Sequence, residues 1–498
     1  MIRYYTSAVS LLVTAFAFGQ TQHSAYTAVG KGVATTFLTD YQSLGVNNSA
    51  LGWGTGYDDK TTTMGTSEFG FGITSPALDK ERVDNAFKGI QNTIFDRDNE
   101  SFDLDAQREA AAEYAEAGIA IDADYNWFGL SYQSEDFGGI AVAIRERYSW
   151  FSQLNEQTSD LVFRGKLSNY FDSLDIYMDG EISTIANSPD LSEDTLNAVI
   201  RGRSNDPSRL SEITDGSGIR MSWNREFNIG YGRRIVGEDS TFALYGGVGG
   251  RFIRSIAMFD FSSSDGELSL NSAISPFYEI DYGDVALDNP SSLLEKDGLL
   301  PQVTGNGYGV DLSLSAIIFK KLKLAAAVNN FGSITYDKNV YSVRDTSIQE
   351  LSVSGLDDYD VTESMSQLLQ NGGLFNLVGE ESHTVSNPAN IRFGGSIELG
   401  RMFNVGVDVI APFSSDTPGS LENPVVSIGG DFKPTKWLHL STGYFGGGIY
   451  SHNIPVGVNF VLSEGTYEFG IASRDALAFF IDDTNSVSAA LGFARIRF

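Results

Sequence analysis

The sequence predicts an all-β protein: a 14-stranded antiparallel transmembrane β-barrel with an N-terminal plug, or hatch, and helical extracellular loops. Three observations predict it. Apolar and polar residues alternate with period two in many segments. Short and long connections alternate between those segments. Finally, an export signal opens the chain, and no later apolar run is long enough for a membrane-spanning helix.

The first residues have the pattern of a cleaved secretory signal peptide, residues 1–19. Arg3 supplies the positive charge, residues 8–18 form a short apolar run, and Ala17 and Gly19 are the small residues before a cleavage site. A membrane anchor is the alternative, but the run is short for a span. We therefore expect an exported protein of the bacterial outer membrane.

The composition favours many strands over a disordered chain or an array of small exported domains. Gly (53), Phe (33) and Tyr (22) are abundant, Pro (12) is scarce, and Cys is absent. Small exported domains often depend on disulfides, whereas one large closed barrel does not. The formal net charge of −30 argues against a nucleic-acid partner, since phosphates attract Lys and Arg. Nothing in the sequence indicates a cofactor or a metal.

Period-two alternation is the strongest signal, because it marks strands with two unlike faces. Between residues 219 and 231 the odd positions are mostly apolar and the even positions polar, and residues 308–316 alternate in the same way. In a membrane barrel the apolar face meets lipid and the polar face lines the interior. The expected strands are 67–75, 118–133, 138–150, 218–236, 240–262, 307–318, 322–336, 389–399, 402–412, 424–433, 436–446, 453–463, 466–473 and 486–498.

The connections between these strands alternate in length, as in outer-membrane barrels, where periplasmic turns are short and extracellular loops long. The larger extracellular insertions are expected near 76–117, 151–217, 263–306 and 337–388. Folding about the short turns should bring polar side chains together across strands, which fixes the register. The expected pairs are Asp124 with Arg147, Asn126 with Arg145, and Glu226 with Arg251.

The loops contain helical patterns, and the chain ends as an outer-membrane strand does. Helices are expected within 76–94, over 106–116, and over 193–201 after a Ser192 cap.

The terminal Phe498, on an amphipathic last strand, resembles the recognition signal of the bacterial barrel-assembly machinery. We therefore expect that machinery and outer-membrane lipid as partners.

The predicted barrel domain comprises residues 67–498. Residues 20–66, which precede it, are Gly-rich, so we expect them to fold into the wide interior of the barrel as a plug. Here the sequence resembles the FadL-like outer-membrane β-barrel superfamily, most closely the large uncharacterised Bacteroidetes outer-membrane proteins of that fold. The hatch residues that carry the resemblance are Gly30, Asp40, Asn47, Asn48 and Leu51. Further matches are GNGYGVDLSLS at 305–315, AVNNFG at 327–332 and NPANIRFGG at 387–395. One departure concerns the hatch motif, where Asn48 or Ser49 stands in place of the usual Pro.

The resemblance implies passive transport of a hydrophobic small molecule, of the fatty-acid or hydrocarbon class, through a plugged lumen. It leaves open a second role, a non-transporting scaffold or partner of a Bacteroidetes-type protein secretion system. For transport, the candidate ligand-binding residues are His23, Tyr26, Phe87, Ile90 and Ile94.

A lateral gap in the wall is possible at Asn126, Trp127 and Glu146. The apolar residues change face after Trp127, which requires a bulge or break near 126–129. Glu146 falls on an otherwise apolar face, where a charge is costly. The alternative interpretation is that these strands rise above the lipid at this height.

The sequence argues against an enzyme. His439 and Ser441 share a strand face, as a base and a nucleophile would, but the face opposite is the apolar one. Asp96, Asp98 and Glu100 resemble the start of a calcium loop, yet Ser101 replaces its glycine, so a solvated acidic loop is the simpler interpretation.

Overall fold

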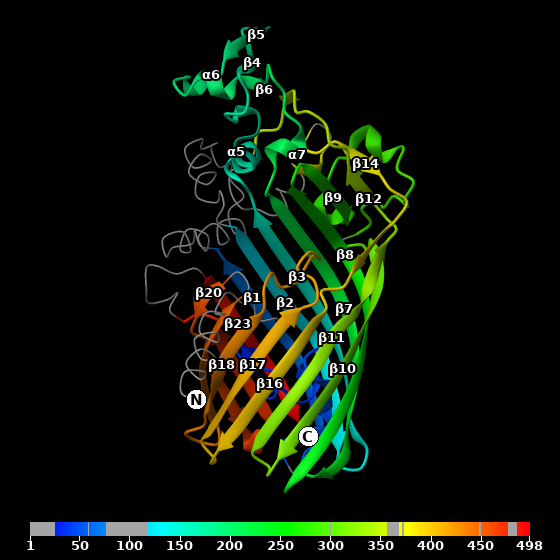
Figure 1. Cartoon of the computed structure of the whole chain (residues 1–498), viewed down its shortest axis with the longest axis vertical. Helices are drawn as coiled ribbons and strands as arrows, with labels where there is room; N and C mark the ends of the chain where they lie inside the picture. Colours follow the sequence, from blue (N-terminus) through cyan, green and yellow to red (C-terminus); the bar gives the residue numbers. More distant parts are fainter. Residues whose placement is uncertain are drawn as a thin grey trace, which may run out of the picture.

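The computed structural model describes residues 25–57, 59–75, 118–298, 300–355, 368–370, 373–447, 450–476 and 486–498. Within these ranges fourteen antiparallel strands form a closed barrel, as predicted (Figure 1). Each strand pairs with the next barrel strand along the chain, and the last, β23, pairs back with β1. The barrel strands are β1 (Thr62–Thr74), β2 (Ile119–Ser134), β3 (Gly138–Gln153), β7 (Gly218–Glu238), β8 (Phe242–Ser264), β10 (Gly305–Ile318), β11 (Leu322–Tyr336), β16 (Asn390–Leu399), β17 (Phe403–Pro412), β18 (Val425–Phe432), β19 (Leu438–Gly447), β21 (Val456–Leu462), β22 (Tyr467–Ser473) and β23 (Ser486–Arg497).

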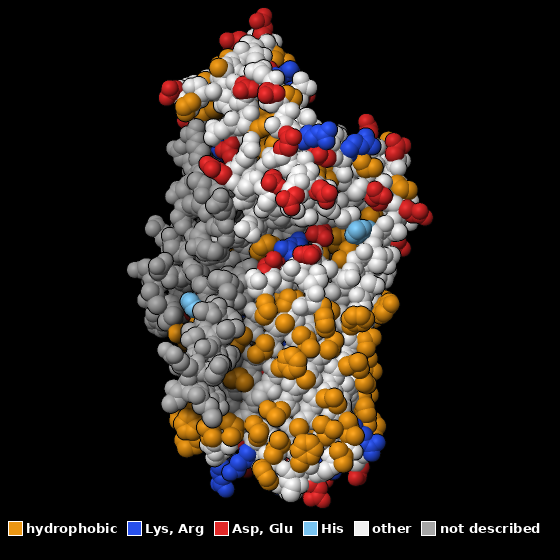
Figure 2. Space-filling view, viewed as in Figure 1, with side chains coloured by type: hydrophobic (Ala, Val, Ile, Leu, Met, Phe, Trp, Pro, Cys, Tyr) orange, Lys and Arg blue, Asp and Glu red, His pale blue; other side chains and the backbone are white. Residues whose placement is uncertain are grey.

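Side chains alternate between the outer and inner faces of the wall. In β10 Tyr308, Leu312 and Leu314 are more than half exposed, whereas Asp311 and Ser313 between them are buried. The same alternation on neighbouring strands makes an apolar belt around the lower part of the barrel (Figure 2). None of the helices in the described part of the chain is long and apolar enough to cross a membrane.

The connections separate by length to the two ends of the barrel. One end, here the short-turn end, carries the connections at 135–137, 239–241, 319–321, 400–402, 433–437 and 463–466, the last of which includes η6 (Ser463–Gly465). The C-terminus lies at this end (Figure 1). β1 begins at Thr62, earlier than the predicted residue 67, because Thr61 and Thr62 already bond the backbone of Phe498.

The opposite, long-loop end carries a cap of small elements (Figure 1). Its helices are α5 (Glu156–Arg164), η3 (Gly165–Leu167), α6 (Glu193–Asn197), α7 (Leu210–Ile213), η4 (Pro276–Tyr278) and η5 (Gly283–Ala286). Its strands are β4 (Ser173–Met178), β5 (Glu181–Ala186), β6 (Val199–Arg203), β9 (Glu267–Ile274), β12 (Val340–Val343), β13 (Glu350–Leu351), β14 (Leu377–Gly379), β15 (His383–Ser386) and β20 (Tyr450–Asn453). A separate sheet, ordered β13-β6-β4-β5, projects furthest from the barrel.

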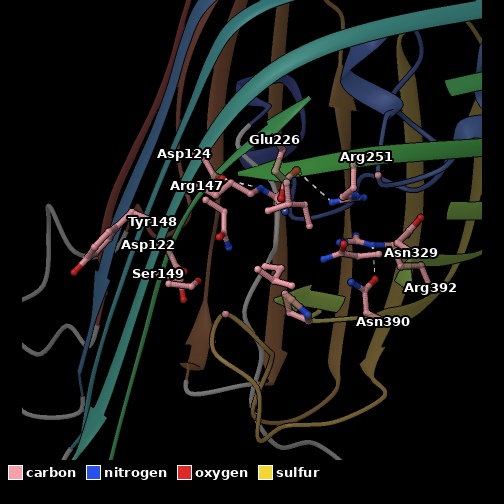
Figure 3. A pocket seen from close by; sticks show the side chains of 18 of the residues that line it. Asp122, Asp124, Arg147, Tyr148, Ser149, Glu226, Arg251, Asn329, Asn390 and Arg392 are labelled. Carbon is pink, nitrogen blue, oxygen red and sulfur yellow. Dashed lines mark hydrogen bonds and ion pairs between the residues drawn. The ribbon is translucent and has the colours of Figure 1, made fainter. Parts of the chain in front are cut away.

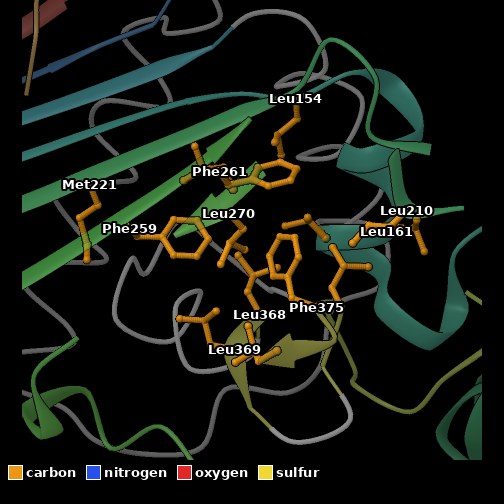
Figure 4. Close-up of a cluster of buried hydrophobic side chains, with 14 of the residues drawn as sticks. Leu154, Leu161, Leu210, Met221, Phe259, Phe261, Leu270, Leu368, Leu369 and Phe375 are labelled. Carbon is orange, nitrogen blue, oxygen red and sulfur yellow. The ribbon is translucent and has the colours of Figure 1, made fainter. Parts of the chain in front are cut away.

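An apolar core joins the cap to the upper ends of β3, β7 and β8. Phe259 and Phe261 of β8 contact Phe375 at ring-centroid distances of 6.1 and 5.1 Å (Figure 4). Leu161 of α5 and Leu210 of α7 belong to the same buried cluster. The cap is therefore packed onto the barrel rather than tethered to it.

One predicted loop helix is only partly correct. α6 begins after Ser192, whose side chain accepts a hydrogen bond from the Thr195 backbone N–H, as predicted. The helix ends at Asn197 and not at residue 201, because Val199–Arg203 forms β6 and pairs with β4. The helices expected within 76–94 and over 106–116 lie outside the described residues.

The segment before β1 lies inside the barrel as a plug, with the short helices α2 (Tyr26–Val29), η1 (Tyr41–Ser43) and η2 (Asn48–Trp53) (Figure 1). It fits because wall glycines face it. The Tyr41 ring lies against Gly65 and Gly129, where an added Cβ would stand within about 2 Å of it. Many of the glycines in the wall are therefore there to admit the plug.

Candidate functional site

The wall is irregular at one height where the barrel closes. Between β1 and β2 the ladder is interrupted between the Gly65–Gly129 pair and the Glu68–Asn126 pair. Two residues of each strand are unpaired there, and the register is the same on both sides. Ser67, at the centre, has a φ of 56°. The β1–β23 and β22–β23 registers also skip residues near this point.

β2 carries the bulge that the sequence predicted near 126–129. Its pairing with β3 shifts register between Asn126 and Phe128. Tyr125 therefore pairs with Glu146, and Phe128 with Ile144, so the apolar residues on both sides of the bulge share the outer face. The β2–β3 ladder shifts by one residue at the bulge and then continues, whereas on the β1 side two residues of each strand stay unpaired.

Glu146 does lie on the outer face, but its charge is compensated there. Its carboxylate accepts hydrogen bonds from Trp127 Nε1 at 3.0 Å and Trp223 Nε1 at 2.8 Å. The Arg225 guanidinium donates to it as well, at 3.1 Å. A paired, hydrogen-bonded carboxylate is tolerated where a lone one is not.

These residues edge an open, largely apolar pocket on the outer wall, here called the wall pocket. Its volume is about 1080 Å³. Rings line most of it: Trp223 contacts Phe277 and Tyr278 of η4 edge-on, at 5.7 and 6.2 Å between centroids. Burial raises the pKa of Tyr278, so its hydroxyl stays protonated. The wall pocket is lined by Phe69, Ala123, Asp124, Tyr125, Trp127, Glu146, Tyr148, Trp223, Phe277 and Tyr278.

A second cavity, here called the lumen cavity, lies inside the barrel between the plug and the long-loop end and is polar (Figure 3). Charged side chains pair along its wall, between neighbouring strands: Arg147 with Asp124 at 3.1 Å, and Arg251 with Glu226 at 3.3 Å. Asp124 and Tyr148 line both cavities, so only the β2–β3 wall separates the wall pocket from the lumen.

The three predicted cross-strand pairs are confirmed on the inner face of the wall. Asp124 stands opposite Arg147, and Asn126 opposite Arg145. Glu226 reaches Arg251 diagonally, since Asn228 is the direct partner of Arg251 in the ladder.

The plug segment contributes Gly45 to the lining of the lumen cavity and is bonded to several sides of the barrel. Arg145 of β3 donates to the Leu44 and Tyr41 carbonyls at 2.9 and 2.8 Å. Asp408 of β17 accepts from the backbone N–H groups of Ala34 and Thr35. Lys31, Ser49 and Val46 bond β18, β10 and β11 respectively. Moving the plug would break many buried contacts at once.

The hatch-motif residues all lie within this plug. Gly30 approaches Gly457, Asn48 lies against Gly247 and Gly249, and Leu51 lies against Gly139. Asn47 donates to the Thr35 carbonyl within the plug at 2.8 Å, and Asp40 pairs with Arg495.

Of the candidate ligand residues, only Tyr26 lies in the described part of the chain. Tyr26 packs against Gly492, with Ala472 and Ala490 beside it, and does not line the lumen cavity. His23, Phe87, Ile90 and Ile94 lie outside the described residues, as do Asp96, Asp98 and Glu100. Ser441 is buried beside Gly30 of the plug.

Sequence reasoning did not identify Trp223, Phe277 and Tyr278, which line the wall pocket, or Arg225, which is ion-paired with Glu146. Trp223 and Arg225 lie on the outer face of β7, directly opposite Tyr148 and Glu146 of β3. The pairing of β3 with β7 could have indicated that Arg225 neutralises Glu146. Phe277 and Tyr278 belong to a loop helix, for which the sequence offered no such signal.

A model of the family described as "Family of unknown function (DUF5723)" matches residues 179–464, which is more than half of the chain. No curated protein matches the sequence. Among solved structures the chain is similar to the Pseudomonas putida toluene transporter TodX (10% identity, 97% of this chain and 98% of that one, TM-score 0.38). It is also similar to the Ralstonia pickettii toluene transporter TbuX (11%, 95% and 97%, 0.40) and to a Pseudomonas aeruginosa FadL homologue (10%, 97% and 97%, 0.40). At these scores no inference about function follows.

Proposed function

The chain belongs to the DUF5723 family, whose function is unknown, and we propose that it is an outer-membrane barrel for passive uptake of a hydrophobic small molecule. The short-turn end would face the periplasm and the cap the exterior, as is usual for such barrels. The exposed terminal Phe498, at the short-turn end, would then be the contact for the barrel-assembly machinery.

One observation carries the proposal: an aromatic pocket opens on the outer wall where strand pairing is irregular, and it shares Asp124 and Tyr148 with the lumen cavity. Exposed rings bind apolar molecules well, because they bury a large area with little loss of side-chain freedom. The Glu146 carboxylate already has partners, so the pocket offers a ligand mainly ring faces and edges.

The polarity of the lumen cavity limits what the ligand can be. Ion pairs and amides line it, and an apolar molecule gains nothing by displacing water from them. A hydrocarbon would remain in the wall pocket, whereas a fatty acid could place its polar end near the lumen. Passage to the periplasm would further require the contacts between the plug and the wall to open.

Uptake measurements in whole cells would test the proposal. A host strain without its own hydrophobic-compound channel would express the wild type, Ala123→Trp, which fills the wall pocket, or Ala411→Trp, the matched change on the outer face of β17. We expect Ala123→Trp to reduce uptake of radiolabelled oleate or toluene about tenfold, and Ala411→Trp to leave it unchanged. Equal uptake by all three would refute the proposal.

A protein-binding scaffold, as in a Bacteroidetes-type secretion system, is the second candidate, and one observation favours it. The β4–β5 hairpin at the tip of the cap exposes Tyr177, Met178 and Ile182, which are 55%, 42% and 65% exposed. An apolar tip on an otherwise acidic chain suits a protein contact. If a stoichiometric protein copurifies with the wild type but not with Ile182→Ser, the result would support the scaffold role, and a transport role would not be required to explain the protein.

A further inference from the structure

The outer wall has a second hollow, which lies further round the barrel from the wall pocket, on the strands that follow β7. It lies over β8, β10 and β11, with Tyr231 of β7 and Ile391 of β16 at its edges. Gly246 and Ala326, which flank Leu314 in the ladder, provide little side-chain volume there, so the wall is recessed. The lining residues are Tyr231, Gly246, Gly247, Val248, Leu312, Ser313, Leu314, Ala326, Ala327, Val328 and Ile391.

Directly below this hollow, the short turn between β10 and β11 is basic. Lys320 and Lys321 are both exposed there, next to Phe319, which is 69% exposed. The next two hairpin turns around the barrel add Arg401 and Lys436, also exposed. Among the residues that the structure describes, none of these four bases is ion-paired.

This basic sector contrasts with the chain as a whole, which has 64 acidic residues against 34 basic ones. Other short turns carry acids instead: Glu135 and Asp136 between β2 and β3, and Glu464 between β21 and β22. Exposed aromatic rings accompany the bases, with Phe403 at 48% and Trp437 at 49% exposure. Aromatic rings prefer the membrane interface, and basic side chains just beyond them lie at the level of the lipid phosphates.

The geometry points to a binding site for one anionic phospholipid of the short-turn leaflet, with its phosphate at Lys320 and Lys321 and an acyl chain reaching into the hollow. Leu312 lies six residues above the end of β10, which is about 20 Å along the strand. With a strand tilt of about 40°, the rise is roughly 15 Å, half the thickness of a hydrocarbon core. The outward residues Ala316 and Leu324 keep the path between turn and hollow apolar.

Native mass spectrometry of the full barrel, released from nanodiscs of equal phosphatidylglycerol and phosphatidylcholine, would test the site. We expect the wild type to retain phosphatidylglycerol preferentially. The double variant Lys320→Gln/Lys321→Gln should lose that preference, by roughly 5- to 30-fold, because two phosphate-level charges are removed. Ala326→Phe, which fills the hollow, should lower retention of both lipids.

The matched control is Glu135→Gln/Asp136→Asn, on the turn between β2 and β3, which should retain phosphatidylglycerol as the wild type does. Raising the salt before release should weaken the wild-type preference, because the headgroup contact is exposed. An unchanged preference in the lysine double variant would overturn the site. So would equal retention of the two lipids by the wild type, or normal retention by Ala326→Phe. Because this experiment does not measure uptake, its result tests the lipid site independently of the proposed transport function.

Discussion

Asp40 of the plug and Arg495 of the last strand form an ion pair beneath the seam where β23 closes onto β1. Arg495 Nε lies 3.1 Å from Asp40 Oδ2, and Arg495 also donates to Glu468 of β22 at 2.8 Å. On the other side of the seam, Tyr41 donates to Glu68 of β1 at 2.6 Å. The plug therefore bonds both strands that close the barrel, so its docking and the closure of the barrel stabilise each other.

Asp40→Asn should loosen the plug, because it removes a buried charge that Arg495 faces. Arg495 keeps Glu468, so we expect a cost of about 1–3 kcal/mol rather than loss of the fold. In planar bilayers the variant should show frequent open events that the wild type lacks. Wild-type conductance in Asp40→Asn would show that the pair does not hold the plug.

Gly129→Ala should displace the plug without touching a charge. Its new methyl would lie 2.1 Å from Tyr41 Cδ2, closer than any normal contact. Gly250→Ala is the matched control, since the nearest atom to its methyl is a carbonyl at 4.0 Å. We expect raised conductance and a lower unfolding temperature in detergent for the first variant only, and similar behaviour of the two would contradict the tight fit.

Glu146→Ala should destabilise the wall, because Arg225 would be left without a partner near lipid. Arg225 is 27% exposed, so we expect a modest loss of about 1–3 kcal/mol. The double variant Glu146→Ala/Arg225→Ala should recover part of it. Thermal unfolding of the three proteins in one detergent measures this, and a double variant no more stable than Glu146→Ala would argue against the pairing.

Much of the barrel could be predicted because lipid and lumen impose opposite polarity on successive residues. β10 and β11 were expected at 307–318 and 322–336 and are found at Gly305–Ile318 and Leu322–Tyr336. The same logic gave the Asp124–Arg147 contact, which depends only on a short turn.

The wall pocket could be predicted only in part. Trp127 and Glu146 stood out because each breaks the pattern of its own strand. Trp223 fits the apolar face of β7 and so gave no signal. Arg225 breaks that face, but only the pairing of β3 with β7 places it opposite Glu146. The elements of the cap were harder still to predict. The residues of β6 follow a helix N-cap signal in the sequence, yet they form a strand because they pair with β4 and β13. Contacts distant in sequence override local preference there.

The projecting sheet of the cap should weaken at low pH. Burial alone would raise the pKa of Asp175, but hydrogen bonds from Thr184 and Arg203 outweigh it, so the pKa of this carboxyl is lowered. A lowered folded-state pKa means that the stabilisation is complete above the ordinary aspartate value, about 4, and is lost as the pH falls through the folded value. Hydrogen exchange of β4–β6 should therefore rise below about pH 4. In Asp175→Asn it should be faster at neutral pH and change less with pH.

The central claim is that a hydrophobic molecule binds at the wall pocket, and fluorescence quenching by a brominated long-chain fatty acid tests it most directly. The purified barrel in non-ionic detergent should show saturable quenching that the unbrominated acid reverses. Trp127→Phe/Trp223→Phe should abolish it, while Trp437→Phe, at the short-turn end, should retain it. Saturable quenching that survives in the double variant, or none in the wild type, would contradict the account.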